Sequence, residues 1–300
     1  MNLASVLSLG QTALELGLIC SLTVLALFLS YSMLNVCDLS TDGCFTLGAA
    51  VGAVVALSGH PFLAIIAAMT AGVCSGFVTA LLQTRMGVDS LLSGIIVNTG
   101  LYSVNIAVMG GAAQLNLNKA DTVFTMMKDL LKETPLSGQY KLVTAILFVV
   151  LAVLFLTFFL NTRLGLSIRA TGDNPDMVRA SSINTGLTVT IGLALSNSIT
   201  ALSGAVLAQY QKTADINLGT GMVIIGLASL IIGETVFRGR KIWVKALGAV
   251  VGCIIYRFII AIALRLDLPS ECLKLVSAVI VAIAIALPTI KKKQGGKAKC

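Results

Sequence analysis

Residues 141–160 read KLVTAILFVVLAVLFLTFFL, an apolar run as long as the stretch that an α-helix needs to cross a bilayer. A spanning helix takes about 20 predominantly apolar residues, and roughly 17–25 are tolerated. We therefore predict an all-α polytopic membrane bundle of about 8–10 transmembrane helices. Comparable runs lie at residues 12–35, 43–58, 61–84, 90–110, 187–209, 219–237, 242–265 and 272–290, of which 43–58 is short and glycine-rich.

The composition excludes an ordinary soluble domain. Of the 300 residues, 57% are hydrophobic and only 11% are charged, whereas about 25% charged residues are usual in soluble proteins. The net charge of +8 gathers in a few loops and in the tail 291–300. A lysine-rich tail could bind nucleic acid, but no soluble domain carries it, so we interpret it as a cytoplasmic topology anchor and expect no nucleic-acid partner. The seven scattered cysteines and the single histidine predict neither a metal site nor a disulfide framework.

The loop charges predict the orientation. With the C-terminus in the cytoplasm and nine spans, most Lys and Arg residues face the inside. The N-terminus, an uncleaved first helix, then lies outside, and so does segment 111–140. If the short run 43–58 is re-entrant, the N-terminus moves inside.

The chain is predicted to form one transmembrane domain with an inverted internal repeat. The joint Asp38–Gly43 and the joint Asp215–Gly221 each run from an acid through polar residues to glycine, ahead of a Gly/Ala-rich helix. Such breaks either line a cavity near the membrane midplane, where helix N-termini could bind a substrate carboxylate, or are tight surface loops. The expected parts are repeat 1 at about 12–110, the extracellular segment 111–140, a linking helix and cytoplasmic loop at 141–186, repeat 2 at about 187–290, and the basic cytoplasmic tail 291–300.

The extracellular segment contains a short amphipathic helix. Its apolar residues between Thr122 and Lys132 fall toward one side. Two interpretations stay open: the helix lies on the bilayer surface, or it is a lid or docking ledge for an extracellular partner.

Polar residues inside the apolar runs suggest a path for a solute. Asn98, Tyr102 and Asn105 fall at i, i+4 and i+7, which is one stripe of a helix. Arg257 lies well inside a run, where a charge is expensive and needs a carboxylate from protein or substrate. Hydrogen bonding between helices is the alternative explanation for the amides and hydroxyls. The candidate path residues are Asp42, Asn98, Tyr102, Asn105, Asn197 and Arg257.

A polar island, Ala170–Asn184, separates two apolar runs. Asn174 is a good N-cap, Pro175 suits the first helical position, and Asp176 favours the positive end of the helix dipole. A short capped helix is thus predicted from Pro175 to Ser182, in a position to contact a soluble partner.

The same stretch, from Arg169 to Asn184, resembles the cytoplasmic coupling-loop signature of bacterial ABC importer permeases of the branched-chain amino acid and ribose permease superfamily. The similarity extends essentially over the whole chain and is closest to the branch proposed to import aromatic amino acids such as tryptophan or tyrosine. Ser182 stands where many relatives have glycine. Further matching stretches are Asp38–Gly48, Gly192–Asn197, Ser203–Gln209 and Ile225–Glu234.

The resemblance implies a multi-pass permease subunit in the bacterial plasma membrane that pairs with a second copy of itself. Two separate ABC ATPase subunits would use ATP and Mg and would receive the coupling helix, and an extracellular or periplasmic binding protein would deliver the substrate. No GxxxxGK[ST] phosphate loop is present, so we expect no catalytic residue and no cofactor on this chain. The residues implied in coupling are Asp173, Asn174, Pro175, Asp176, Met177, Arg179 and Ile183.

Two other classes of protein fit the sequence less well. An ion- or proton-coupled secondary transporter would share the repeat but needs acids within its spans, and Glu15, Asp42 and Glu234 lie close to the ends of theirs. An intramembrane enzyme needs a catalytic constellation, and His60 has no evident partner.

Overall fold

The computed structural model describes residues 3–132, 137–237, 239, 241–265, 279 and 282. The expected span 272–290, apart from Val279 and Ala282, and the basic tail 291–300 lie outside the described residues. Within them, the predicted apolar runs form helices whose ends agree within a few residues, except at the N-terminus, where the first helix begins earlier. The helix Arg163–Asp173 lies in none of the predicted runs. The helices are α1 Leu3–Leu27 with a π-helical extension Phe28–Met33, α2 Thr41–Leu57, α3 Pro61–Thr84, α4 Ser90–Val108, α5 Val123–Leu130, α6 Tyr140–Leu160, α7 Arg163–Asp173, α8 Pro175–Ala180, α9 Thr185–Gln211, α10 Met222–Val236 and α11 Ile242–Arg265.

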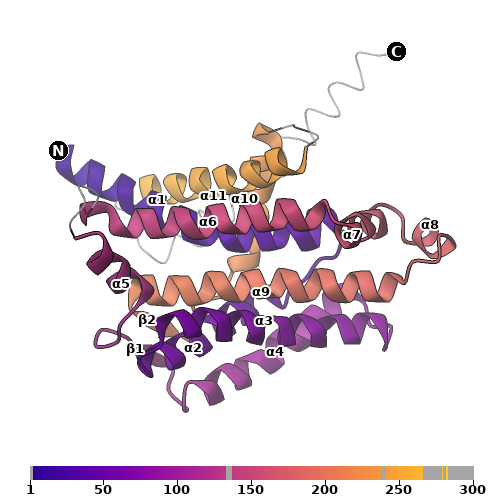
Figure 1. Ribbon diagram of the computed structural model, residues 1–300, viewed down its shortest axis with the longest axis horizontal. Coiled ribbons are helices and arrows are strands. Elements are labelled where there is room, and N and C mark those ends of the chain that lie inside the picture. The colour runs from indigo at the N-terminus through magenta and orange to yellow at the C-terminus, as the bar shows by residue number, and fades with distance from the viewer. Residues whose placement is uncertain are drawn as a thin grey trace.

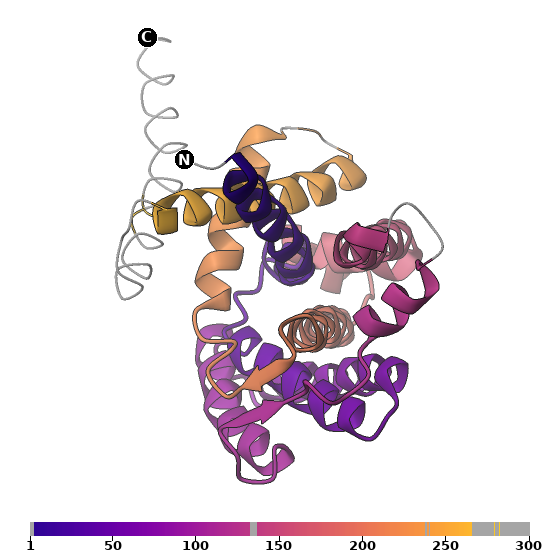
Figure 2. The same ribbon diagram turned by 90° about the vertical axis from the view of Figure 1, so that its left-hand side faces the viewer.

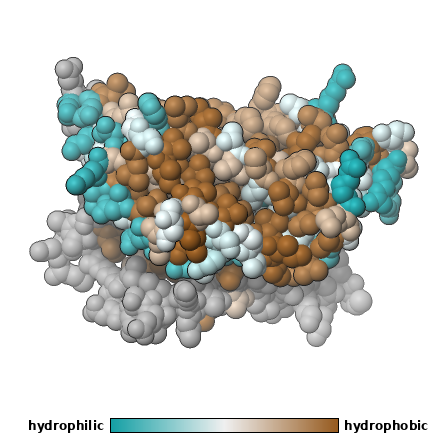
Figure 3. Space-filling view, turned by 90° about the horizontal axis from the view of Figure 1, so that it is seen from below, coloured by the Kyte–Doolittle hydropathy of each residue, from teal (hydrophilic) through white to brown (hydrophobic). Residues whose placement is uncertain are grey.

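The helices have the dimensions and surface of a membrane bundle. Six of those in the described part are long and apolar enough to cross a bilayer, and α2 and α10 are shorter apolar helices. Apolar residues form a broad band between hydrophilic ends in Figure 3. The predicted class, a polytopic helical membrane protein, is confirmed.

Helix α9 occupies the middle of the bundle. It packs along α2 and α3 on one side and along α1 on the other, while α1 packs in turn against α10 and α11; Figure 2 shows α9 end-on between these groups. The first helix of each predicted repeat therefore lies against the later helices of the other repeat. An inverted repeat would produce this crossed packing, in which each first helix contacts the other repeat. The repeat itself stays a prediction.

Glycines allow α3 to approach the backbone of α9. A Cβ atom on Gly72 would overlap the carbonyl oxygen of Asn197, and one on Gly76 would lie 2.5 Å from the carbonyl oxygen of Leu193. Small residues spaced four apart permit such backbone contact between membrane helices. The two helices therefore meet without intervening side chains at these points.

The two ends of the bundle differ. Helix α5, the N-terminus and a two-stranded antiparallel sheet of β1 (Gln114–Asn116) and β2 (Thr213–Asp215) lie at one end. Helices α7 and α8 lie at the other end (Figure 1). The described start of α1 and the polar island thus lie at opposite ends of the bundle, and the number of spans and the side that faces the cytoplasm stay predictions.

Helix α5 is docked on the bundle. Thr122 caps it and forms a reciprocal capping box with Thr125. The backbone N–H of Val123 donates to Oε1 of Gln209 on α9 at 2.9 Å, and the ring of Phe124 packs edge-on against Tyr210 with centroids 5.6 Å apart. The helix is thus held by the end of α9, while Leu130 stays exposed.

Glu234 and Arg238 are spaced at i, i+4, which predicts an ion pair on one helix face, but Arg238 lies outside the described residues. In the described part, Glu234 accepts a hydrogen bond from the Ser32 hydroxyl at 2.6 Å. This bond joins α10 to the π-helical end of α1.

Candidate functional site

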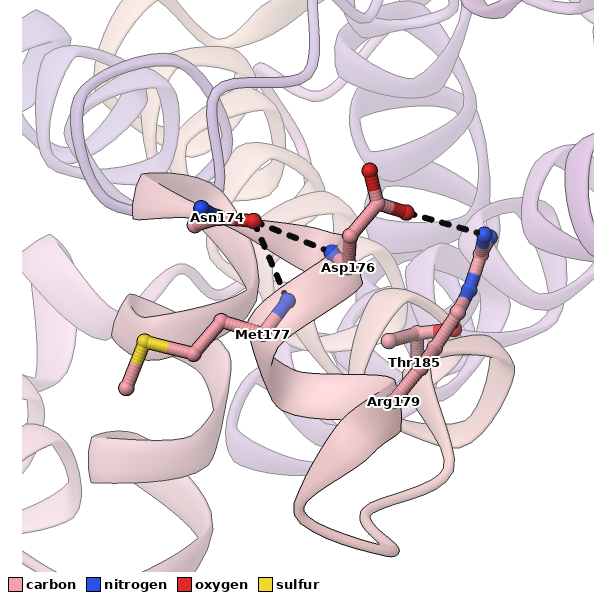
Figure 4. A network of polar contacts seen from close by, with 5 residues as sticks. All are labelled: Asn174, Asp176, Met177, Arg179 and Thr185. Carbon is pink, nitrogen blue, oxygen red and sulfur yellow. Dashed lines mark hydrogen bonds and ion pairs between the residues drawn. The ribbon is translucent and has the colours of Figure 1, made fainter.

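The exposed helix α8 is built by its cap. The side-chain oxygen of Asn174 accepts the N–H groups of Asp176 and Met177, both at 3.1 Å, and Pro175 takes the first position. The cap holds two of the N–H groups that a helix start leaves unpaired. Figure 4 shows both bonds. The helix ends at Ala180, two residues before the predicted end at Ser182.

One residue anchors α8 and its neighbours face outward. Val178 is 3% exposed, whereas Met177 is 66% exposed. The Arg179 guanidinium lies 3.4 Å from the Asp176 carboxylate, and its Nε donates to the Thr185 hydroxyl at 3.3 Å (Figure 4). Exposed pairs of this kind contribute about 0–1 kcal/mol to stability. They orient the Arg179 side chain, and a partner can still bind it.

The turn after α8 has a backbone conformation that explains the glycine of relatives at position 182. Ser182 has φ +60°, a left-handed conformation that glycine adopts without steric cost and other residues seldom adopt. A glycine suits this backbone better than serine does. Asp173, at the end of α7, and Ile183, beyond the turn, are both exposed, so the predicted coupling residues cluster on one outward surface.

Four of the six candidate path residues line one pocket. Asp42, Asn98, Tyr102 and Asn105 surround a cavity of about 310 Å³ between α2, α4 and the loop before α10. Three of them come from the predicted stripe on α4. The two predicted breaks meet at this pocket, since Asp42 and Gly43 belong to the first break and Asn217 and Thr220 to the second.

Asp42 caps the N-terminus of α10. Its two carboxylate oxygens accept the N–H groups of Gly221 at 2.9 Å and Val223 at 2.8 Å. A carboxylate at this position satisfies unpaired N–H groups and complements the positive end of the helix dipole. One of the two interpretations of this break left the N-terminal amides free for a substrate carboxylate; the N–H groups of Gly221 and Val223 are already bound by Asp42.

A buried polar atom of the pocket lining has no partner in the described part of the chain. Asn105 is buried, and its amide nitrogen donates to the carbonyl oxygen of Gly43 at 3.1 Å. Its Oδ1 has no hydrogen-bond partner among the described residues. Tyr102, by contrast, is 53% exposed. The pocket therefore combines a buried acceptor with an accessible aromatic ring.

Asn197 lies outside this pocket and holds the first break in place. Its amide nitrogen donates to the Asp38 carboxylate at 3.0 Å and to the Ser40 hydroxyl at 3.1 Å. The other Asp38 oxygen accepts the Ser40 N–H at 2.8 Å. Asn197 was predicted to be a path residue, and its partner Asp38 was not predicted. The only signal was the position of this acid at the start of the break.

Arg257 is also separate from the pocket. Its Nη2 lies 2.8 Å from Sγ of Cys20 on α1, and its Nε has no hydrogen-bond partner among the described residues. The expected carboxylate partner is not found among the ion pairs of the described part. The arginine instead joins α11 to α1 within the bundle.

These features define a class: a polytopic helical membrane protein with a polar pocket where two broken segments meet and a capped helix exposed at one end. Over residues 11–287 the chain matches the family "Branched-chain amino acid transport system / permease component". The chain belongs to this family, and the expected permease of ABC-type transport systems is confirmed at this level.

Curated relatives agree with the family. The chain is 34% identical over 272 residues to a tyrosine transport system permease protein of Clostridioides difficile, covering 90% of this chain and 88% of the relative. It is 24% identical over 257 residues to the ribose import permease protein of Escherichia coli K12, covering 85% and 78%. A galactose/methyl galactoside import permease protein of the same strain is 26% identical over 221 residues, covering 73% and 63%. No solved structure gives a significant match.

Proposed function

We propose that this chain is the membrane subunit of an importer that moves an amino acid into the cell, with ATP hydrolysed on two separate ATPase subunits that use Mg. Two copies of the chain pair in the bacterial plasma membrane. An extracellular or periplasmic binding protein delivers the substrate at the α5 end. The coupling helix α8 and the C-terminal tail face the cytoplasm.

The observation that carries this proposal is the construction of α8. A pre-capped helix with an exposed thioether and an exposed cation offers a partner a surface that needs no ordering on binding. The buried Val178 ties the helix to the bundle. Helix α8 also connects α7 to α9 directly along the chain. A partner that moves α8 therefore also moves α7 and α9.

The pocket supports an amino acid as substrate. Its volume of about 310 Å³ falls at the lower end of the range of roughly 300–1,000 Å³ for small-molecule sites. The free Oδ1 of Asn105 can accept a hydrogen bond from an ammonium group, and the exposed Tyr102 ring can pack on an aromatic side chain. The similarity to a tyrosine permease favours an aromatic amino acid.

Charge reversal on α8 tests the proposal. The Arg179→Glu variant, reconstituted in vesicles with its ATPase subunits, should lose at least about tenfold in transport per ATP hydrolysed, because the exposed cation that α8 offers to a partner becomes an anion. Membrane insertion should be unchanged. Arg163→Glu is the matched control, since Arg163 is an exposed cation at the start of α7 at the same end of the bundle.

Two results would overturn the assignment. Coupled transport that is unchanged in Arg179→Glu removes α8 as the docking helix. Transport by the purified chain alone, driven by an ion gradient and without nucleotide, would instead establish the secondary transporter.

A further inference from the structure

A second pocket lies on the side of the bundle at the α7–α8 end. It has a volume of about 330 Å³ and is lined by the end of α6, by α7 and by the start of α11. It shares no residue with the candidate substrate pocket. Its lining residues are Thr157, Asn161, Arg169, Lys241, Ile242 and Trp243.

The lining of this pocket is basic. Arg169 and Lys241 both line it, and neither takes part in an ion pair within the described part of the chain. The Thr157 hydroxyl is buried and has no hydrogen-bond partner there. The start of α11 adds the partial positive charge of a helix N-terminus. Two cations, one unused hydroxyl and a helix start therefore converge on one cavity.

The surroundings of the pocket are those of the membrane interface. Trp243 is 49% exposed, and on α6 the neighbouring Phe158 and Leu154 are exposed apolar side chains. Tryptophan concentrates where hydrocarbon meets headgroups, and basic pockets between helices on the cytoplasmic side suit anionic headgroups. An occupant must therefore carry a negative charge on an apolar body.

We propose that this pocket binds the phosphate headgroup of an anionic phospholipid, such as phosphatidylglycerol, in the leaflet at the α7–α8 end. Arg169 and Lys241 attract the phosphate, Thr157 donates to it, and the acyl chains run along α6. Since Arg169 belongs to α7 and α7 ends next to α8, the bound lipid also steadies the base of the coupling helix.

The chain contains a single tryptophan, Trp243, so its fluorescence reports on this pocket alone. The full chain is reconstituted in vesicles with brominated phosphatidylglycerol or brominated phosphatidylcholine at equal mole fraction. Each juxtamembrane cation strengthens binding to an anionic lipid about fivefold. Quenching should therefore show a preference for phosphatidylglycerol of about tenfold or more in the wild type.

Charge removal tests the residues. Arg169→Gln and Lys241→Gln should each lower the preference about fivefold. The double variant Arg163→Gln/Lys245→Gln is the matched control, because it removes one cation from α7 and one from the first turn of α11 without touching the pocket lining; it should keep the preference.

Each other outcome counts against the proposal. Equal quenching by the two lipids in the wild type refutes the lipid site, and this comparison needs no variant to fold. Quenching relieved by millimolar inorganic phosphate would assign the pocket to free phosphate. A preference that the control variant loses equally would reduce it to general surface charge.

Discussion

The cap that Asp42 forms on α10 is expected to be a main determinant of stability where the two breaks meet. The Asp42→Ala variant removes the acceptor of two N–H groups, at 2.8 and 2.9 Å. Hydrogen bonds to charged groups contribute about 1.5–3 kcal/mol each. Since the pocket is open enough for water to solvate the freed N–H groups, we take the lower value for each bond. The free energy of unfolding should fall by about 3 kcal/mol.

The measurement is the midpoint of thermal or detergent-induced unfolding of the purified chain. Asp42→Asn keeps one acceptor oxygen and should lose about half as much. Asp89→Ala is the control: Asp89 also caps a membrane helix, accepting the Leu91 N–H at 2.9 Å, but it is exposed. That variant should lose about 1 kcal/mol. A loss in Asp42→Ala no larger than in Asp89→Ala would refute the reasoning.

Three further predictions concern local contacts. Gly219→Ala should destabilise the chain by several kcal/mol, because the added methyl group overlaps the main-chain carbonyl oxygen of Asp42. Gly100 has open space around it, so Gly100→Ala should raise the unfolding midpoint slightly. Equal effects of the two variants on the unfolding midpoint would contradict this. Ser182→Gly should stabilise the turn by about 1 kcal/mol by relieving its left-handed strain, and slower protease cleavage there would show it. Gln209→Ala should release α5 from α9, so the amide hydrogens of α5 should exchange faster while those of α3 do not change.

Much of the bundle could be predicted from the sequence because lipid imposes length and apolarity on each span. The same logic fails for short elements. The strands Gln114–Asn116 and Thr213–Asp215 have three residues each and form only against one another, so neither carries a periodic pattern of its own. Helix α7 was missed because its polar face resembles a loop when its packing surface is unknown.

The candidate site was predictable in part. The stripe of Asn98, Tyr102 and Asn105 follows from helical spacing, and it does line one pocket. The hydrogen bond between Asp38 and Asn197 joins residues 159 positions apart. No local sequence pattern predicts a contact between residues so far apart. Asn197 and the stripe residues are all polar side chains inside apolar runs, so the sequence alone does not show that Asn197 lies outside the pocket.

The contact between α3 and α9 limits how the molecule can deform. Side chains can change rotamer and let two helices slide, but at Gly72 and Gly76 one main chain rests directly on another. Backbone atoms cannot move out of the contact by a rotamer change, so we expect α3 and α9 to move as one rigid unit. Any rocking of the bundle must therefore occur at contacts other than the one between α3 and α9. Two probes, one on α3 and one on α9, should keep a constant separation.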